Sequence, residues 1–579
     1  MLVRRARNRA SGGSAAVRAG RGSGPATSFA LALLLLLSVL VLVPIVAMVY
    51  GATRTNDLGE PGGTFTLEPL REAFTNGRYL VTIGGTLVIS CVVAIVCVGV
   101  GAAFAWVLSR TNVPGKKTLE MGLIAPLFLS PFVGAIAWVT LAAENSGMLN
   151  VNLRHIFGQD FTLVDVQSTG GLLWVLCLYY IPYGYLFVSA ALKNMDPALE
   201  DASYVNGLGH IQTALRVTFP IIRPAMAAAF FFVAVSAMGI FSVPGVLAIG
   251  GGFRPIAVEI FREAQVYPTD FSMAAALSTV VLLLTIVGIF LYRRAVADAA
   301  KYVTVSSRGF RPRVIDIGRV RYVVVAAVAL YGFLSVVLPY AALVLMALNP
   351  YTIPDLTAMH LTLDNVVNAL TSTRILESLR NTIALGVMAP TIACIIALAV
   401  AQLVHRTDTR LRMLVDYLAT LPIAIPGIVL AAGMVWAYIR TPLYGTLAIL
   451  LIAYVASYLP NASLLVTNGL TQIDRSLEEA AWVSGAGRGR AALGITLPLV
   501  MPAIFSAWIM VFIFTVREIN AAIMLYSPRS TVLSVLTWDY IETGSIQYAA
   551  VVGLLQTCLL LAGVVVARYV LRVRLSVAI

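Results

Sequence analysis

The chain has 579 residues, of which 59% are hydrophobic and only 12% are charged. Soluble globular proteins carry about a quarter of their residues as charged side chains, so this composition excludes that class. The formal net charge of +13 would suit a nucleic-acid partner. However, the arginines and lysines gather in alternate loops, as the positive-inside rule requires of a membrane protein, and we predict no nucleic-acid partner.

Apolar runs of about 20 residues, long enough to cross a bilayer as a helix, recur along the whole sequence. We predict an all-α polytopic membrane protein of about twelve helices in contact with lipid. The basic tail (1–27) and the other basic loops place both termini in the cytoplasm. The first apolar run exceeds the roughly 7–15 residues of a signal-peptide core, so we expect it to remain as a span. The predicted spans are 28–51, 79–108, 119–143, 170–193, 223–249, 272–294, 319–348, 379–404, 411–438, 443–468, 499–525 and 548–571.

Two polar stretches between these runs, 196–224 and 474–502, are copies of each other. Their acidic, glycine and proline positions match at one offset (474 − 196 = 278), and repetition at a fixed offset indicates a repeated architecture. The matching pairs are Asp196/Asp474, Glu200/Glu478, Ala202/Ala480, Gly207/Gly485, Gly209/Gly487, Pro220/Pro498 and Pro224/Pro502.

Matches nearer the N-terminus have a larger offset of 296, as in Arg110 with Arg406 and Pro126 with Pro422. The difference of 18 residues (296 − 278) falls in the outer loop after the third span, which is longer in the first copy. We therefore predict two parallel six-helix repeats. The predicted domains are a first half (28–294), a basic cytoplasmic connector (295–318) and a second half (319–579).

Each copied loop has the residues of a short helix with defined ends. Asp196 and Asp474 suit the helix N-cap, and Gly207 and Gly485 suit a C-terminal break. We expect a second helical stretch after each glycine (210–218 and 488–496), stopped by Pro220 and Pro498. Such a helix, glycine elbow and helix could be an ordinary interfacial pair. Its presence at equivalent places in both repeats favours a docking element.

The second loop reads E-E-A-A-x3-G-A-G and resembles the EAA loop of binding-protein-dependent ABC importer permeases. The first loop departs from that pattern, with Asp201-Ala202-Ser203 in place of E-A-A. The resemblance implies that each loop inserts a coupling helix into a groove of a nucleotide-binding subunit. It also implies two ATPase copies, an extracytoplasmic binding protein and a location in the bacterial inner membrane. The coupling residues implied are Glu200, Asp201, Gly207, Glu478, Glu479 and Gly485.

The sequence contains no Walker A motif (G-x4-G-K-S/T), the loop that cradles nucleotide phosphates. We therefore expect a permease subunit that is not an enzyme, with ATP and Mg²⁺ bound by the partner ATPase. The five cysteines fall inside predicted spans without metal-ligand spacing, so we predict neither a metal site nor a cofactor in this chain.

Charges inside a span are costly and mark functional sites. Arg517, Glu518 and Asn520 lie in the predicted eleventh span, whereas the first half has Gly239 and Ile240 at the matching positions. These polar residues either line the translocation pathway or brace a bend near the outer mouth.

The segment 517–525 resembles the E-L-P-A-T-x-L-L segment of ferric-iron importer permeases, as do V-P-G-V-L at 243–247 and T-G-S-I-Q-Y-A-A at 543–550. The resemblance implies ferric iron as the solute. Permeases for thiamine, 2-aminoethylphosphonate, polyamines and sulfate share the scaffold and remain alternatives. A secondary transporter of the major-facilitator layout is the rival class, although the basic loop at 110–117 lacks the G-x3-D-R-x-G-R-R pattern of that family. A membrane-embedded transferase is less favoured because no convergent carboxylate, histidine or nucleophile set is found.

Overall fold

The computed structural model describes residues 23–55, 63–158, 161–248, 253–297 and 314–569, and these form helices joined by loops. Most of the predicted basic tail (1–27) and connector (295–318) lies outside the described residues. The helices of the first half are α2 (Ser23–Leu37), η1 (Ser38–Leu42), α3 (Val43–Gly51), α4 (Glu68–Thr75), α5 (Gly77–Arg110), α6 (Lys116–Ile124), η2 (Ala125–Phe128), α7 (Pro131–Ala142), α8 (Met148–Phe157), α9 (Thr169–Asn194), α10 (Ala198–Val205), α11 (His210–Thr213), η3 (Ala214–Thr218), α12 (Phe219–Met238), α13 (Ser242–Leu247), α14 (Ile256–Gln265) and α15 (Phe271–Ala297).

The second half repeats this order without a counterpart of α8, because its outer loop after the third span is short. Its helices are α16 (Val320–Gly332), η6 (Phe333–Val337), α17 (Leu338–Leu348), η7 (Leu356–Ala358), α18 (Asp364–Thr371), α19 (Thr373–Arg406), α20 (Arg412–Thr420), η8 (Leu421–Ala424), α21 (Gly427–Tyr438), α22 (Leu447–Thr471), α23 (Ser476–Val483), α24 (Arg488–Ala491), η9 (Ala492–Thr496), α25 (Leu497–Val516), α26 (Ala522–Leu525), α27 (Leu533–Glu542) and α28 (Ile546–Tyr569).

Among the described residues, ten helices are long and apolar enough to cross a membrane, and two bent helix pairs raise the number to twelve. The count agrees with the sequence prediction, but the third and ninth spans are not straight. They bend by 95° and 112° where Pro131 and Pro426 follow residues in extended conformation. The ring of a proline disfavours helical backbone at the preceding residue, so these bends follow from Ser130-Pro131 and Ile425-Pro426.

The predicted helix stops at Pro220 and Pro498 are wrong. The helix of the fifth span runs without a break from His210 to Met238, and that of the eleventh from Gly489 to Val516. Each proline follows a π-helical turn, which widens the helix and accommodates a residue that lacks the N–H donor. In the described part of the chain the same arrangement occurs four times, with η1 before Pro44, η3 before Pro220, η6 before Pro339 and η9 before Pro498.

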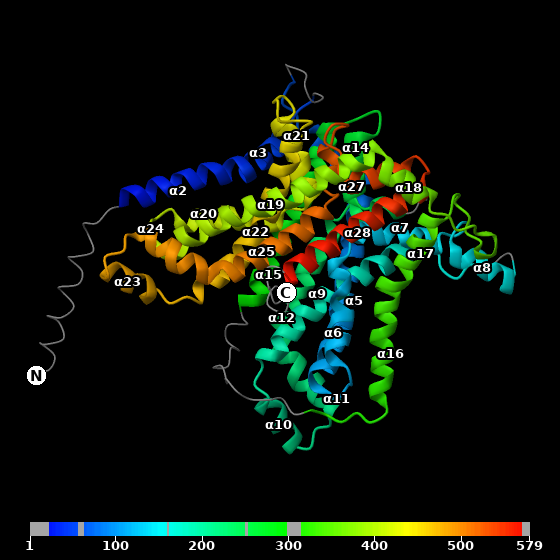
Figure 1. Cartoon of the computed structure of the whole chain (residues 1–579), viewed down its shortest axis with the longest axis horizontal. Coiled ribbons are helices and arrows are strands. Elements are labelled where there is room, and N and C mark those ends of the chain that lie inside the picture. Colours follow the sequence, from blue (N-terminus) through cyan, green and yellow to red (C-terminus); the bar gives the residue numbers. More distant parts are fainter. Residues whose placement is uncertain (1–22, 56–62, 159–160, 249–252, 298–313, 570–579) are drawn as a thin grey trace, which may run out of the picture.

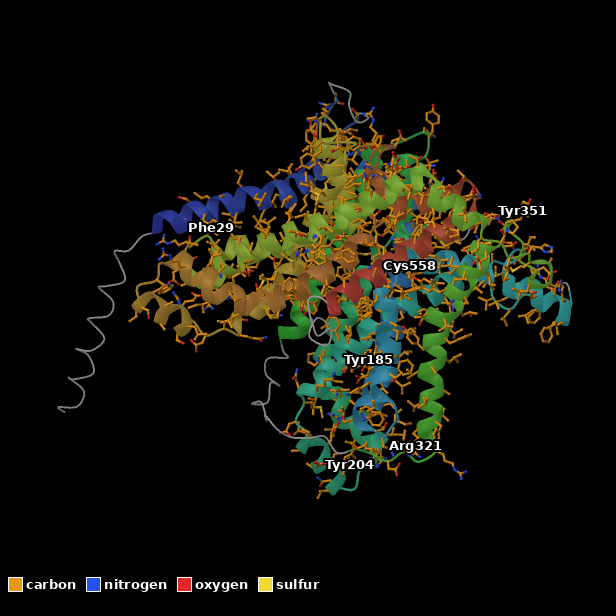
Figure 2. The ribbon with its side chains drawn as sticks, in the orientation of Figure 1. Phe29, Tyr185, Tyr204, Arg321, Tyr351 and Cys558 are labelled. Atoms are coloured by element: carbon orange, nitrogen blue, oxygen red, sulfur yellow. The ribbon has the colours of Figure 1, made fainter. Side chains whose placement is uncertain are left out.

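Two legs diverge from a shared region of the molecule (Figure 1). One leg contains α5, α9 and α12 and ends at α10 and α11, and the other contains α19, α22 and α25 and ends at α23 and α24. Figure 2 shows Tyr204 of α10 at the far end of the first leg. The two copied loops therefore lie apart, one at the end of each leg.

The first span of each half packs on the other half. The hydroxyl of Tyr438 in α21 donates a 2.8 Å hydrogen bond to the carbonyl of Val39 in η1. In the same way, the hydroxyl of Tyr331 in α16 donates to the carbonyl of Leu178 in α9 at 2.7 Å. Figure 1 shows α2 lying along α20, and α16 lying beside α6. The two sequence repeats are thus interlocked in space.

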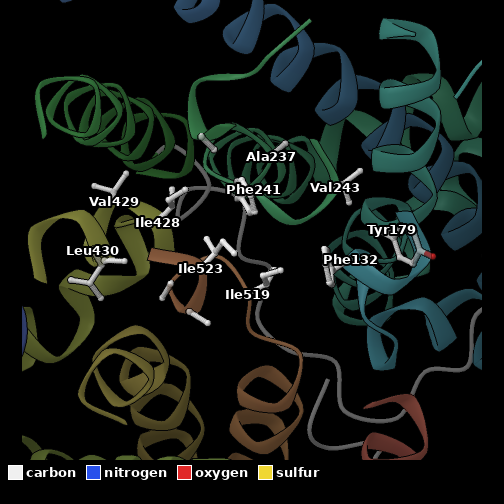
Figure 3. Packing of buried hydrophobic residues seen from close by; sticks show 14 of the residues in the cluster. Phe132, Tyr179, Ala237, Phe241, Val243, Ile428, Val429, Leu430, Ile519 and Ile523 are labelled. Carbon is white, nitrogen blue, oxygen red and sulfur yellow. The ribbon is translucent and has the colours of Figure 1, made fainter. Parts of the chain in front are cut away.

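Aromatic and branched side chains fill the region between the legs. The ring of Phe241 lies 4.9 Å from that of Phe261 and 5.2 Å from that of Trp538, measured between centroids. Phe241 clusters there with fully buried Ile428 and Ile519 of the second half (Figure 3). This cluster fixes the ends of α12 and α25, and with them the polar residues that follow α25.

Glycine permits the close crossing of α5 and α9, and its replacement is expected to destabilise the chain. A Cβ at Gly101 would lie 2.5 Å from the backbone nitrogen of Tyr185, whereas one at Gly99 would meet no atom within 4 Å. We expect Gly101→Ala to lower the free energy of unfolding by about 1–3 kcal/mol through overpacking. Thermal unfolding of the detergent-purified chain measures this effect, with Gly99→Ala as the control. Equal melting temperatures for the two variants would contradict the close contact between α5 and α9 at Gly101.

Candidate functional site

The glycine breaks of both copied loops are as predicted, but the N-cap positions are Pro197 and Arg475, one residue after the predicted Asp196 and Asp474. The Asp196 carboxylate accepts the N–H of Ala198 at 2.9 Å, and Asp474 accepts that of Ser476 at 2.9 Å. The second bond lowers the pKa of Asp474. Each short helix ends at a glycine with positive φ, +82° at Gly207 and +86° at Gly485. These left-handed positions turn the chain sharply toward α11 and α24.

Only one of the two adjacent carboxylates in each copied loop is exposed. Glu200 and Glu478 are only 6% and 5% exposed, whereas Asp201 and Glu479 are exposed. Buried carboxylates require a charge partner or several hydrogen bonds. Each copied loop therefore has one buried and one exposed acidic residue.

In the first loop, the partner of Glu200 is Arg110 at the end of α5. The Nε of Arg110 lies 2.9 Å from a carboxylate oxygen of Glu200, and both side chains are buried. Arg110 also donates to the carbonyl of Leu192 at 3.2 Å, and the hydroxyl of Thr218 donates to Glu200 at 2.7 Å. This triad ties α10 to the ends of α5 and α9 and to the π turn η3.

The second loop contains the same triad. The Nε of Arg406 lies 3.2 Å from a carboxylate oxygen of Glu478, and the hydroxyl of Thr496 donates to Glu478 at 2.6 Å. Arg406 also donates to the carbonyl of Ile473 at 3.0 Å, at the end of α22. Each short helix is thus fastened rigidly to its leg.

The outward side of each short helix presents apolar side chains at matching positions. Val205 and Val483 are 88% and 90% exposed, and Leu199 and Leu477 are also exposed. The arrangement combines an exposed apolar tip, an exposed carboxylate and a buried ionic attachment. Such a surface can transmit force from a docked protein into the leg.

The first loop has one additional attachment. Segment 314–317 of the connector pairs with the end of α5, where Ile315 donates to the carbonyl of Arg110 at 2.8 Å and Asn112 donates to the carbonyl of Ile315 at 3.0 Å. The Asn112 side chain also donates to Asp316 at 2.6 Å. The connector is therefore fixed next to the first triad.

Arg517, Glu518 and Asn520 lie beyond the end of the helix of the eleventh span, which does not continue to residue 525 as predicted. The α25 helix ends at Val516, and the chain breaks before α26. The Nη1 of Arg517 donates to the carbonyls of Leu127 and Leu129 at 2.6 and 3.1 Å, at the bend of the third span. The guanidinium also lies over the ring of Phe514.

Glu518 and Asn520 also form hydrogen bonds. Glu518 is buried and accepts the hydroxyl of Tyr458 and, at 2.8 Å, the N–H of Ala521. The Asn520 side-chain oxygen accepts the N–H groups of Phe241 and Ser242 at 2.9 and 3.2 Å. Arg517 and Asn520 thus bind backbone groups of the other half, which makes this a contact between the repeats.

These residues border a cavity of about 320 Å³ between the two legs. Its lining comes in pairs at an offset of 278, such as Tyr180 with Tyr458 and Tyr183 with Asn461. The pairing places the cavity on the axis that relates the two repeats. Arg517 and Glu518 break the symmetry, because their counterparts are Gly239 and Ile240.

Comparison with known proteins agrees with this architecture. Residues 403–574, which contain the second loop and its triad, match the family described as binding-protein-dependent transport system inner membrane component. The ferric transport system permease protein FbpB of Actinobacillus pleuropneumoniae is 27% identical over 502 residues, covering 85% of this chain and 71% of that protein. These matches support a binding-protein-dependent ABC importer permease.

Two further relatives define the permease more closely. A putative ferric transport system permease protein FbpB 1 of Haemophilus influenzae is 28% identical over 489 residues, covering 81% of this chain and 74% of its own length. The sn-glycerol-3-phosphate transport system permease protein UgpA of Yersinia pseudotuberculosis is 25% identical over 251 residues. That alignment covers 83% of UgpA but only 42% of this chain. This ABC permease is therefore a multi-pass inner-membrane protein that resembles the ferric transport permeases over most of its length.

Sequence reasoning missed the buried arginines of the permease triads. The sequence analysis predicts Arg110 and Arg406 as basic residues that set the topology and as a matched pair of the repeat, without an ion pair to the loops. The two arginines match at offset 296, and the two loops that contain the carboxylates match at offset 278. This repetition in both halves could have indicated the ion pairs. A charge repeated at equivalent places in two halves, next to a repeated carboxylate, indicates an ion pair rather than a solvated charge.

Proposed function

We propose that this permease imports ferric iron as the transmembrane subunit of an ATP-driven importer. The observation that carries the proposal is the alignment with two proteins named as ferric transport permeases, which covers more than four fifths of this chain in each case. An extracytoplasmic binding protein would deliver the iron to the outer face. Both termini would lie in the cytoplasm, in agreement with the distribution of basic residues.

Two copies of a separate ATPase would bind this chain, one at each leg. The duplicated loops support this number, because each has the same buried triad and the same exposed valine at its tip. ATP and Mg²⁺ would bind the ATPase subunits. Their closure would draw α10 and α23 together, and the triads would pass this motion to α5, α9, α19 and α22. In this proposal, Asp201 and Glu479 contact the ATPase, and Glu200 and Glu478 hold the coupling helices in place.

The proposal is tested by purifying the chain from its native membrane in mild detergent and identifying its partners by mass spectrometry. We expect an ATPase at about two copies per chain, and a binding protein that binds ferric iron. Thiamine, 2-aminoethylphosphonate, polyamines and sulfate are offered to the same binding protein as competing solutes. A chain that purifies alone and transports in liposomes without ATP would contradict an ABC importer.

Replacing Gly485 with proline tests the second coupling loop. Proline holds φ near −65°, which is incompatible with the +86° at this position. It also removes the N–H that donates to the carbonyl of Trp482 at 3.0 Å. We expect substrate-stimulated ATPase activity to fall by at least about 10-fold, since this strain exceeds about 1.4 kcal/mol. Gly487→Ala is the control because a Cβ at Gly487 meets no atom within 4 Å. Unchanged activity in Gly485→Pro would exclude the coupling role.

A further inference from the structure

The size and the lining of the central cavity indicate in which chemical form the solute crosses the membrane. Its volume of about 320 Å³ corresponds to about ten water molecules, at roughly 30 Å³ each. Six water-sized ligands around one ion would occupy about 180 Å³ on the same scale. The cavity is therefore large enough for a metal ion together with a complete shell of its own ligands.

The charged groups of the lining offset each other. Arg517 and Glu518 are the only guanidinium and carboxylate among the described residues that line the cavity. Arg517 is bound by two backbone carbonyls, and Glu518 is bound by the Tyr458 hydroxyl and the Ala521 N–H. A trivalent cation moved into this site without its ligands would face one carboxylate already engaged, beside a fixed positive charge. Burial of such an uncompensated charge is strongly unfavourable.

The remaining polar lining is neutral and rich in hydrogen-bond donors. The phenols of Tyr180 and Tyr183, the amide of Asn461 and the hydroxyl of Ser457 border the cavity from both halves. The Ser457 hydroxyl is shielded from solvent and has no hydrogen-bond partner among the described residues. Hydroxyl and amide groups donate to oxygen atoms of a ligand, and such bonds are stronger when the acceptor is anionic. The lining suits the oxygen-rich surface of a complexed ion better than the ion itself.

We infer that the cavity takes up ferric iron still bound to small oxygen-donor anions, as a complex of low net charge held by the neutral donors of its wall. This inference rests on the proposed ferric function, because it describes the cargo of that transport. It implies that an anion crosses together with the metal. Ser457, Tyr183 and Asn461 are then specificity-determining residues for the ligand shell, while Arg517 and Glu518 are held in place by protein groups.

The test is a double-label uptake experiment in liposomes that contain the complete transporter, the binding protein and ATP. The binding protein is loaded in separate runs with ⁵⁵Fe and ¹⁴C-citrate, or with ⁵⁵Fe and ³²P-phosphate. We expect at least one labelled anion to accumulate with the iron at a constant ratio and only with ATP. Iron uptake without either anion would overturn the inference and leave the ferric function intact. Absence of ATP-driven iron uptake with either anion would overturn both.

A variant pair makes the same test at the cavity wall. Ser457→Ala removes one donor, and we expect about 3–10-fold slower uptake of the doubly labelled complex, the effect of one lost hydrogen bond. Ser90→Ala is the matched control, because the Ser90 hydroxyl on α5 is also buried without a partner among the described residues but does not line the cavity. Equal uptake by the two variants would show that the donors of the wall do not bind the cargo.

Discussion

Replacing Glu478 with alanine is expected to abolish ATP-driven uptake while the chain remains in the membrane. The substitution leaves the Arg406 side chain, which is only 12% exposed, with no carboxylate beside it and leaves the Thr496 hydroxyl without its acceptor. Removing one partner of a buried ion pair costs about 3–5 kcal/mol, a large share of the stability of a short segment such as α23. The coupling helix would then detach from its leg. The measurements are co-purification of the ATPase and substrate-stimulated ATPase activity, and both should fall by at least about 100-fold on this scale.

Two further variants distinguish attachment from direct contact with the ATPase. Glu479→Ala removes the exposed neighbour, whose i,i+4 pair with Arg475 is exposed to solvent, and we expect a smaller loss, because exposed ion pairs contribute about 0–1 kcal/mol. The double variant Glu478→Leu with Arg406→Met replaces the buried pair by apolar groups and should restore attachment of α23. Full activity in Glu478→Ala, or no recovery in the double variant, would contradict the role of the triad.

Replacing Arg517 with glutamine is expected to reduce ATP-driven uptake by at least about 10-fold. Arg517 joins the end of α25 to the bend of the third span in the other half through the carbonyls of Leu127 and Leu129. Hydrogen bonds from a charged donor contribute about 1.5–3 kcal/mol each. The variant also leaves Glu518 buried without its neighbouring positive charge. The expected defect is in the maximal rate of uptake, because the two halves would no longer move as a unit at this contact.

The kinetics separate the two roles considered for Arg517. As a positioning residue, Arg517 should affect the rate at saturating binding protein and leave the half-saturating concentration unchanged. A direct contact with the cargo would instead raise that concentration. Arg319→Gln, at an exposed position just before α16, is the control and should transport at the normal rate.

Much of the fold follows from local sequence. Apolar runs predicted the twelve spans, and fixed offsets predicted the repeats, the short helices of the copied loops and their glycine elbows. The bends before Pro131 and Pro426 were not predicted, although each proline restricts the residue that precedes it, because other prolines of the chain lie inside unbroken helices. The π turns were not predicted because a proline in an apolar run has two outcomes, a helix stop or a widened turn. The surrounding packing decides between them.

The candidate site depended more on contacts between distant segments. Arg110 and Glu200 are 90 residues apart, and the two ends of the Arg517–Leu127 contact are 390 residues apart. No local pattern brings such residues together. The break after Val516 was missed for the same reason, because the hydrophobicity of 499–525 continues past the point where Arg517 and Asn520 bind the other half.

The exchange of first spans between the halves fixes an order of events during synthesis. Val39 receives its hydrogen bond from Tyr438, which is translated 399 residues later. At roughly 5–20 residues per second, the ribosome needs about 20–80 seconds to cover that interval. During this time the surface of α3 that will contact α21 has lipid or insertion machinery beside it. This early segment therefore completes its packing only after most of the second half has been made.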